Sequence, residues 1–185
     1  MIRHALSALV LTLLFLPAPA AAQRVLHRVR FGETLPGICQ AYYGDDAAAP
    51  LVAEANGFDP TRPLRAGEVM RVPTAVAFTP QEATTLEQLA ARFLGDRRRW
   101  KALAVLNKLG RKKAWRPGKA LLLPFVLGHT VAAGDSYAEL ARRYYGGAKY
   151  ASVISTFNFA TAAKPTYGTQ LEIPIVHLQI TAEKL

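Results

Sequence analysis

The sequence has almost no cysteine, since Cys39 is the only one in 185 residues. A lone cysteine excludes an internal disulfide framework and the Cys-x-x-Cys pattern typical of zinc and redox sites. Cys39 lies in an apolar series with Leu35, Ile38 and Tyr42, and this i, i+3, i+4, i+7 spacing predicts the inner face of a helix. We therefore interpret it as a small buried hydrophobic residue, not as a reactive thiol.

Catalytic motifs are also missing, because the sequence contains neither His-x-x-x-His nor Gly-x-Ser-x-Gly. A hydrolase would need paired carboxylates, a Cys-His pair or a metal constellation in a domain of its own. The repeats described below leave no room for such a domain. His27 aligns with His129 and with Phe78, so we interpret these histidines as structural. We expect no enzymatic activity, no cofactor and no metal.

Long apolar runs are absent after residue 22. Residues 1–22 contain Arg3, an apolar run from Ala5 to Leu16 that is too short to span a bilayer, and the small residues Ala20 to Ala22. This order is typical of a secretory signal peptide cleaved after Ala22. We expect the remainder to be exported to the periplasm, the cell wall or the extracellular space, with no transmembrane segment.

Acidic residues are scarce, with 13 Asp and Glu against 23 Lys and Arg. Much of the excess forms one stretch that no acidic residue interrupts: Arg97, Arg98, Arg99, Lys101, Lys108, Arg111, Lys112, Lys113, Arg116 and Lys119. Such a basic stretch attracts anionic polymers, and the alternative is a solvated face without a dedicated ligand. We expect no nucleic acid partner, because the chain is predicted to be exported and has no recognised nucleic-acid-reading motif.

The most informative pattern that is present is a unit repeated three times. Each copy has a glycine, an asparagine and a closing proline. The glycines and the asparagines recur every 51 residues (95−44 and 146−95), and the third copy is one residue shorter between its asparagine and its proline. These landmarks are Gly44, Gly95 and Gly146, then Asn56, Asn107 and Asn158, then Pro73, Pro124 and Pro174. A unit of this length is near the lower limit for folding on its own core, so we expect an α+β protein of three tandem minidomains that lean on one another.

Local signals within each copy predict the order β-α-α-β. Thr34, Thr85 and Ser136 are placed to cap the first helix, and Gln88 and Glu139 would complete capping boxes. The repeated glycine should end that helix at positive φ, and the repeated asparagine should be left-handed at the end of the second helix. The expected strands are 26–31, 69–72, 120–123, 130–131 and 170–173.

These landmarks divide the chain into a signal peptide, three units and a tail. The predicted boundaries are 1–22, 24–74, 75–125, 126–175 and 176–185. Linkers of five residues, Pro73 to Phe78 and Pro124 to His129 (78−73 and 129−124), favour a compact array. The tail from Ile175 to Ile180 alternates apolar and polar residues, so it is a candidate for an added strand or a partner contact.

The copies resemble the LysM domain. The first reads His27-Arg-Val-Arg-Phe-Gly-Glu-Thr-Leu35, then Ala53-Glu-Ala-Asn-Gly57, then Leu64-Arg-Ala-Gly67 before Val72-Pro73. This is similar in order and spacing to the LysM pattern of a Gly-Asp-Thr start, an Ala-Asn helix end and a Leu-x-x-Gly exit. The third copy matches through Gly134-Asp-Ser136, Asn158 and Leu171-Glu-Ile-Pro174. The second has Ala83-Thr84 instead of the Gly-acid pair, so its ligand loop departs from the pattern.

The resemblance implies binding of N-acetylglucosamine polymers, peptidoglycan or chitin, in a shallow groove between the loop after the first strand and the loop after the second helix. The implied residues of the first groove are Gly32, Glu33, Thr34, Leu35, Asn56, Gly57 and Phe58. Those of the third are Gly134, Asp135, Ser136, Tyr137, Asn158 and Phe159. Loop N–H and C=O groups can pair with an acetamido group, and an apolar side chain can cover its methyl.

We therefore predict non-catalytic binding of peptidoglycan by an exported protein with several LysM domains. The basic stretch adds stem-peptide carboxylates, or another anionic envelope polymer, as a candidate partner. The alternative is an envelope scaffold that uses LysM-like repeats to hold a partner protein.

Overall fold

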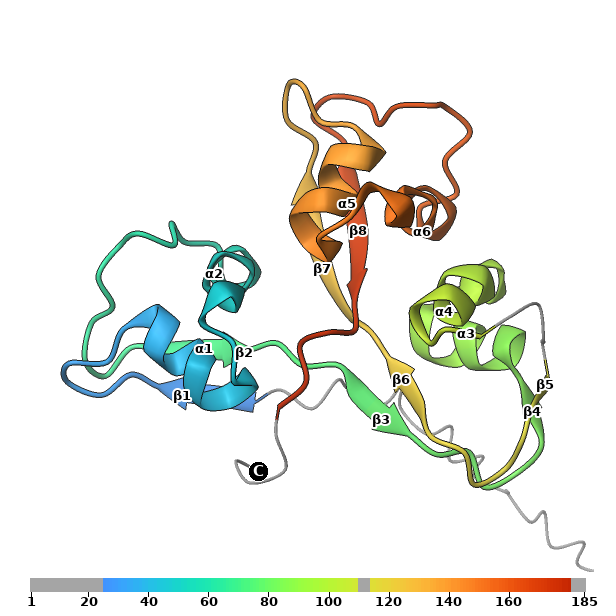
Figure 1. Ribbon diagram of the computed structural model, residues 1–185, viewed down its shortest axis with the longest axis horizontal. Helices are drawn as coiled ribbons and strands as arrows, with labels where there is room; N and C mark the ends of the chain where they lie inside the picture. The colour runs from blue at the N-terminus through green and yellow to red at the C-terminus, as the bar shows by residue number, and fades with distance from the viewer. Residues whose placement is uncertain (1–24, 110–113, 181–185) are drawn as a thin grey trace, which may run out of the picture.

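The computed structural model describes residues 25–109 and 114–180 (Figure 1). The predicted signal peptide and residues 111–113 of the basic stretch lie outside these ranges. The first segment, residues 25–72, contains β1 (Val25–Arg28), α1 (Leu35–Tyr43), the 3-10 helix η1 (Asp46–Ala48), α2 (Ala49–Asn56) and β2 (Val69–Val72).

The second segment, residues 76–123, contains β3 (Val76–Phe78), β4 (Thr84–Thr85), α3 (Leu86–Leu94), η2 (Arg97–Arg99), α4 (Trp100–Leu106), β5 (Ala114–Trp115) and β6 (Leu121–Leu123). The third segment, residues 125–175, contains β7 (Phe125–Thr130), α5 (Tyr137–Tyr145), η3 (Ala148–Tyr150), α6 (Ala151–Phe157) and β8 (Gln170–Ile175). The predicted mixture of helices and strands is confirmed. The 3-10 turns and the pair β4–β5 were not predicted.

Each segment pairs its first and last strands antiparallel and packs two helices against them (Figure 1). In the first segment Val25 lies opposite Val72, and in the third Thr130 lies opposite Gln170. The pairs are β1–β2, β3–β6, β4–β5 and β7–β8. Both predicted five-residue linkers are wrong, because strand β3 begins at Val76 within the first and strand β7 begins at Phe125 and occupies the second.

All three predicted helix caps form, but only one of the two predicted capping boxes is complete. The side chains of Thr34, Thr85 and Ser136 each accept a hydrogen bond from the N–H three residues later. Thr85 completes a capping box with Gln88. The capping box expected at Ser136 is only half formed, because the carboxylate of Glu139 pairs with the Arg142 guanidinium instead.

The repeated glycines end the first helix of each segment as predicted. Gly44, Gly95 and Gly146 have φ of 70°, 76° and 73°, in the left-handed region that favours glycine. The left-handed conformation predicted for the repeated asparagines is wrong. Asn107 and Asn158 have φ of −92° and −94°, and Asn56 is the last residue of α2. The positive φ falls one residue later, at Gly57, Lys108 and Phe159.

The repeated asparagine has another structural role. The Nδ2 atom of Asn56 donates to the carbonyls of Val52 and Arg71, both at 2.8 Å, and its Oδ1 accepts the N–H of Arg71 at 2.7 Å. Asn107 and Asn158 repeat this arrangement in their own segments. Each asparagine therefore joins the second helix to the last strand, which explains why the residue recurs at this spacing.

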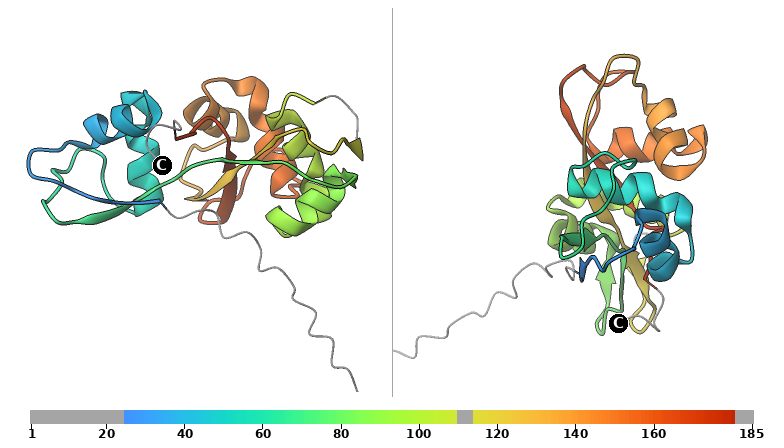
Figure 2. Two further views of the ribbon diagram at one scale, coloured as in Figure 1. Left: turned by 90° about the horizontal axis from the view of Figure 1, so that it is seen from below. Right: turned by 90° about the vertical axis from the view of Figure 1, so that its left-hand side faces the viewer.

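The three segments do not have separate cores. Buried side chains of the first segment, such as Ile38 and Val52, belong to one apolar cluster with Tyr144 and Ile154 of the third. Phe157 of α6 is in turn buried with the core of the second segment. Figure 2 shows the three helix pairs from two further sides. Shared burial fits units that are too small to bury enough apolar surface alone.

The C-terminal tail packs into the shared core and contacts the connection between the first two segments. Leu178 is 1% exposed within the shared core, and its carbonyl accepts the N–H of Ala75 at 2.7 Å. Ile180 N–H also approaches the Thr74 hydroxyl oxygen at 3.3 Å. After Ile175 the tail therefore packs on the connection between the first two segments and does not add a strand to the third.

Candidate functional site

A surface hollow of about 910 Å³ lies in the first segment, between the loop after β1 and the loop before β2. It is lined by residues 30–36 and 60–66. Backbone hydrogen bonds from Val29 N–H to Glu68 O and from Gly67 N–H to Val29 O, both 2.8 Å, hold the two loops side by side. Four residues of the predicted groove, Gly32 to Leu35, are in its lining.

The other predicted wall lies elsewhere. Asn56, Gly57 and Phe58 are not among the residues that line this hollow. The amide of Asn56 forms hydrogen bonds with the backbone of Val52 and Arg71. The Arg62 guanidinium lies 4.1 Å from the centre of the half-buried Phe58 ring. The second wall consists of the proline- and arginine-containing loop 60–66, which sequence reasoning missed because that loop has no periodic pattern.

The loop after β1 is held by its own acidic residue. The Oε2 atom of Glu33 accepts the Arg30 N–H at 2.7 Å and lies 2.8 Å from His27 Nε2. The Tyr42 hydroxyl lies 3.1 Å from His27 Nδ1. The hydrogen bond from the Arg30 N–H, with the one to His27, holds the pKa of Glu33 below its usual value. The carboxylate of Glu33 is therefore occupied in shaping the loop.

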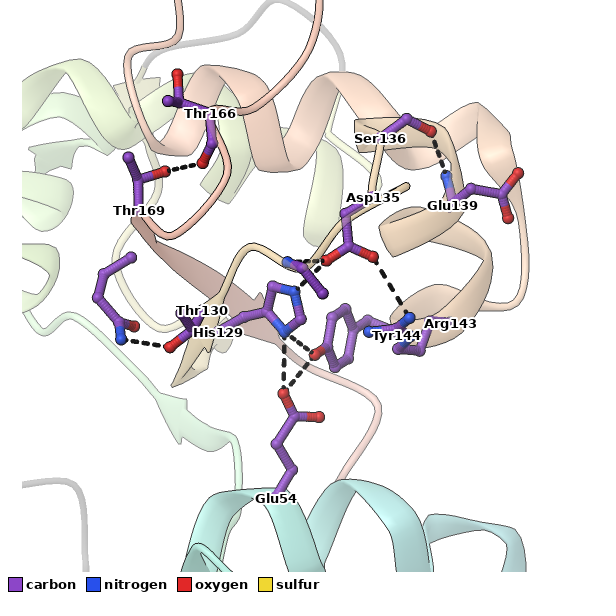
Figure 3. A network of polar contacts seen from close by, with 12 residues as sticks. Glu54, His129, Thr130, Asp135, Ser136, Glu139, Arg143, Tyr144, Thr166 and Thr169 are labelled. Carbon is purple, nitrogen blue, oxygen red and sulfur yellow. Dashed lines mark hydrogen bonds and ion pairs between the residues drawn. The ribbon is translucent and has the colours of Figure 1, made fainter.

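The same arrangement recurs in the third segment (Figure 3). The Oδ2 atom of Asp135 accepts the Ala132 N–H at 2.8 Å and lies 2.9 Å from His129 Nε2, and the Tyr144 hydroxyl lies 2.8 Å from His129 Nδ1. The spacings are the same, six from histidine to acid and fifteen from histidine to tyrosine (33−27 and 135−129, 42−27 and 144−129). We name this set the His-acid-Tyr triad.

The second segment replaces the whole triad. Phe78 stands where the other segments have histidine, and its ring packs at 4.6 Å on that of Phe93, which replaces the tyrosine. Thr84 stands in place of the acid. The joint loss of all three polar groups was a sequence signal for the triad that single-position reasoning missed. This loop lines a separate hollow of about 510 Å³.

The apolar contacts predicted for the two grooves are largely buried. Leu35 is 3% exposed and Tyr137 9% exposed, so both belong mainly to the core. The ring of Phe159 packs against the second segment, with the guanidinium carbons of Arg98 and Arg99 at 3.9 and 5.4 Å from its centre. Phe31, which sequence reasoning did not select, lines the first hollow and is 97% exposed.

Part of the predicted basic stretch is paired. Arg98 forms an ion pair with Asp96, whose pKa is lowered to about 2 by hydrogen bonds from Arg98. Arg99 pairs with Glu172 of β8 and donates to the carbonyls of Leu94 and Phe157. Its side chain is 16% exposed, so it joins two segments and does not face a ligand. Trp115 is buried and donates its indole N–H to a carbonyl within the same stretch.

Within residues 25–109 and 114–180, no three His, Cys, Asp or Glu side chains are grouped so as to hold a metal ion. The same ranges contain no helix that is long and apolar enough to cross a membrane. Burial raises the pKa of the Cys39 thiol to about 12, as expected for a core residue.

Comparison with known proteins identifies a domain family for part of the chain. The chain is 31% identical over 132 residues to two proteins named as esterases from strains of Mycobacterium tuberculosis, and the match covers 71% of this chain but 29% of theirs. Spore cortex-lytic enzymes SleL of Bacillus cereus and Bacillus megaterium share 19% and 17% identity, over 55% and 61% of this chain and 23% and 24% of theirs. Their TM-scores, 0.24 and 0.25, are too low to support an argument. Residues 27–73, which contain the hollow of about 910 Å³, match the family model of the LysM domain, so this part of the chain is a member of the LysM family.

Proposed function

We propose that the protein binds cell-wall glycan containing N-acetylglucosamine, with peptidoglycan as the natural polymer, and does not cleave it. The observation that carries this proposal is the hollow of about 910 Å³ between two loops of the LysM domain. Its lining combines exposed backbone at Gly32, the exposed residue Phe31 and the hydroxyl of Thr34. Such a surface suits a sugar, which offers apolar ring faces and many hydroxyl and amide groups.

We further propose that the second and third segments are LysM-like units, so that the chain is a tandem array of three. The repeated element order and the recurrence of the asparagine link support this. The triad supports it for the third segment, where Asp135 shapes the loop that contains Gly134 and Ser136. Weak sites on one chain raise each other's effective concentration, so the array would bind a polymer by avidity.

The proposal of a non-catalytic role rests on how the acids near the candidate sites are used. The carboxylates of Glu33 and Asp135 each accept a backbone N–H and face a histidine, an arrangement that shapes a loop. The curated relatives are named esterases, but this chain aligns with less than a third of their length. A shared binding part attached to different catalytic parts would account for those names.

Export to the cell envelope belongs to the same proposal, since a wall polymer is met outside the cytoplasm. The predicted signal peptide in residues 1–22 supports it. The alternative of a scaffold that holds a partner protein is favoured only by the second segment, whose loop lacks the triad. Binding to protein-free glycan distinguishes the two.

The test is co-sedimentation of the full chain with purified, protein-free peptidoglycan. We expect retention of the parent chain, no clearing of the suspension, and about fivefold weaker retention of Phe31→Ala through loss of a stacking contact. Leu26→Ala is the matched control, because Leu26 is an exposed apolar residue of β1 that does not line the hollow. Clearing of the suspension, or equal retention of Phe31→Ala and the parent, would contradict the proposal.

A further inference from the structure

We propose that the groove of the LysM domain prefers acidic glycan, in which a carboxylate accompanies an N-acetylated sugar, over neutral polymers of N-acetylglucosamine. Arg30 and Arg65 would provide this preference. The inference rests on the proposed function and adds to it the charge of the ligand. It follows from the pairing of the charged groups around the hollow, from the position of the two arginines and from their distribution among the segments.

The hollow is lined by three arginines, Arg30, Arg62 and Arg65, and by one acidic residue, Glu33. Glu33 is engaged with His27 and the Arg30 N–H. With Glu68, which pairs with Arg62, included, these residues carry an excess of one positive charge (3−2), in a protein whose formal net charge is already +10. Such a site attracts anionic ligands and disfavours cationic ones.

The next acidic residue along the chain, Glu68, also interacts with neighbouring residues of the protein. It forms an ion pair with Arg62 and accepts the N–H of Arg65 at 3.3 Å. The hydrogen bond from Arg62 holds the pKa of Glu68 below its usual value. Arg62 is therefore compensated. In the part of the chain that the structure describes, neither Arg30 nor Arg65 has a carboxylate within the 4.0 Å of an ion pair.

The two arginines lie on opposite walls of the hollow. Arg30 follows Val29, whose N–H and carbonyl bond to Glu68 and Gly67 on the other loop. Arg65 lies on that other loop, and both arginines are exposed. Because the backbone ladder fixes the two loops against each other, a sugar in the hollow would have an arginine on each side. Phe31, next to Arg30, lines the same hollow and is exposed.

The third segment lacks these features. By the repeat register, Ala132 and Ala133 stand where the first segment has Arg30 and Phe31 (30+102 and 31+102), and Thr166 stands where it has Arg65 (65+102−1). The second segment keeps one arginine, Arg116 (65+51). The preference is therefore assigned to the LysM domain at residues 27–73, not to the array as a whole.

The chemistry that fits is a carboxylate held beside the sugar ring. A guanidinium offers a planar pair of N–H donors that matches a carboxylate, while an N-acetylglucosamine unit offers it only neutral acceptors. A peptide-free glycan that alternates N-acetylglucosamine with N-acetylmuramic acid has a lactyl carboxylate on every second sugar. In peptidoglycan that carries stem peptides, the carboxylates belong to those peptides. The arginines are exposed, so each contact adds a modest preference and not an absolute requirement.

The experiment compares two soluble probes with the full chain by calorimetry. The probes are a neutral tetramer of N-acetylglucosamine and a peptide-free tetrasaccharide that alternates N-acetylglucosamine with N-acetylmuramic acid. We expect the parent to prefer the acidic probe, and Arg30→Gln/Arg65→Gln to reduce the ratio of the two affinities about fivefold with little change for the neutral probe. Arg71→Gln/Arg142→Gln removes the same charge outside the hollow and should keep the ratio.

The outcomes separate this inference from the proposed function. Equal affinity of the parent for the two probes, or an unchanged ratio in Arg30→Gln/Arg65→Gln, would overturn the inference alone. An equal change in Arg71→Gln/Arg142→Gln would also overturn it, because net charge would then explain the preference. Failure of both probes to bind the parent would overturn the proposed function together with the inference.

Discussion

Glu54 and His129 are 75 positions apart in the sequence, yet Oε1 of Glu54 lies 3.1 Å from Nδ1 of His129 (Figure 3). The same oxygen accepts the Tyr144 hydroxyl at 2.5 Å. Glu54 is on α2 of the LysM domain, whereas the other two residues belong to the triad that shapes the third segment's loop. One carboxylate therefore connects the first segment to the third.

The first prediction concerns this contact. Glu54→Ala should lower the free energy of unfolding by about 1–3 kcal/mol, because it leaves the buried Tyr144 hydroxyl and His129 ring with one acceptor fewer. Glu82→Ala, at an exposed loop position of the second segment, is the control and should stay within about 0.5 kcal/mol. Thermal and urea unfolding of the three chains measure the effect. Equal stability of Glu54→Ala and the parent would show that the contact between segments does not contribute to the free energy of unfolding.

A second prediction follows from the acids that hold the loops. The pKa of Glu33 is lowered by its hydrogen bonds from the Arg30 N–H and His27. Burial raises the pKa of Asp135, but its hydrogen bonds to His129 and the Ala132 N–H outweigh that and lower it overall. A lowered folded-state pKa contributes stability that is present above the unfolded value, about 4 for these acids, and is lost as pH falls through the folded value.

The melting temperature should therefore fall as the pH is lowered from about 5 toward 2, where carboxylates with lowered pKa values take up their protons. Glu33→Gln should flatten part of this decline, because the amide cannot titrate. Glu139→Gln is the control, since Glu139 is an exposed helix residue paired with Arg142 across one turn. A decline in Glu33→Gln as steep as in the parent would show that the loop acid does not contribute.

Local features of the fold were predictable because their causes lie within a few residues. A hydroxyl three residues before a polar side chain predicts a cap, as at Thr85 and Gln88, and a glycine after an apolar series predicts a left-handed helix end, as at Gly44. The asparagine conformation was mispredicted for a tertiary reason. The amide of Asn56 reaches the backbone of Arg71 on β2, fifteen residues away, and propensity alone does not report that partner.

The features that could not be predicted depend on how the segments meet. Glu54 aligns with Val105 and Thr156 in the other copies (54+51 and 54+102), so the repeat gives it no special status. Only the placement of α2 beside the third segment reveals its role. Phe159 was likewise assigned to a groove from its position after the asparagine, whereas Arg98 of another segment covers its ring.

A third prediction concerns salt. Lys101 and Lys119 are exposed members of the basic stretch, and their attraction to an anionic wall polymer should weaken as the Debye length shrinks to about 3 Å at 1 M salt. Lys101→Gln/Lys119→Gln should therefore show a shallower loss of co-sedimentation with salt than the parent. A residual retention that depends on Phe31 should survive, since stacking is not screened. Complete loss of retention by the parent at high salt would count against the groove.

The last prediction tests the repeated glycine with a neighbour as its control. Gly146 has φ of 73° and its absent Cβ would meet nothing within 4 Å, so any cost of a side chain there comes from the backbone conformation alone. A β-branched residue in that region is strained by about 1–3 kcal/mol, and Gly146→Val should lower the free energy of unfolding by that amount.

Gly147 has an extended backbone with φ of −167°, and its added Cβ would lie 3.9 Å from Lys149 Cγ, an ordinary contact. Gly147→Ala should therefore change stability by no more than about 0.5 kcal/mol. Because the third segment shares its core with the other two, we expect one cooperative transition at a lower temperature in Gly146→Val, measured by calorimetry. A melting profile of Gly146→Val that coincides with that of Gly147→Ala would mean that the left-handed helix end is not needed in solution.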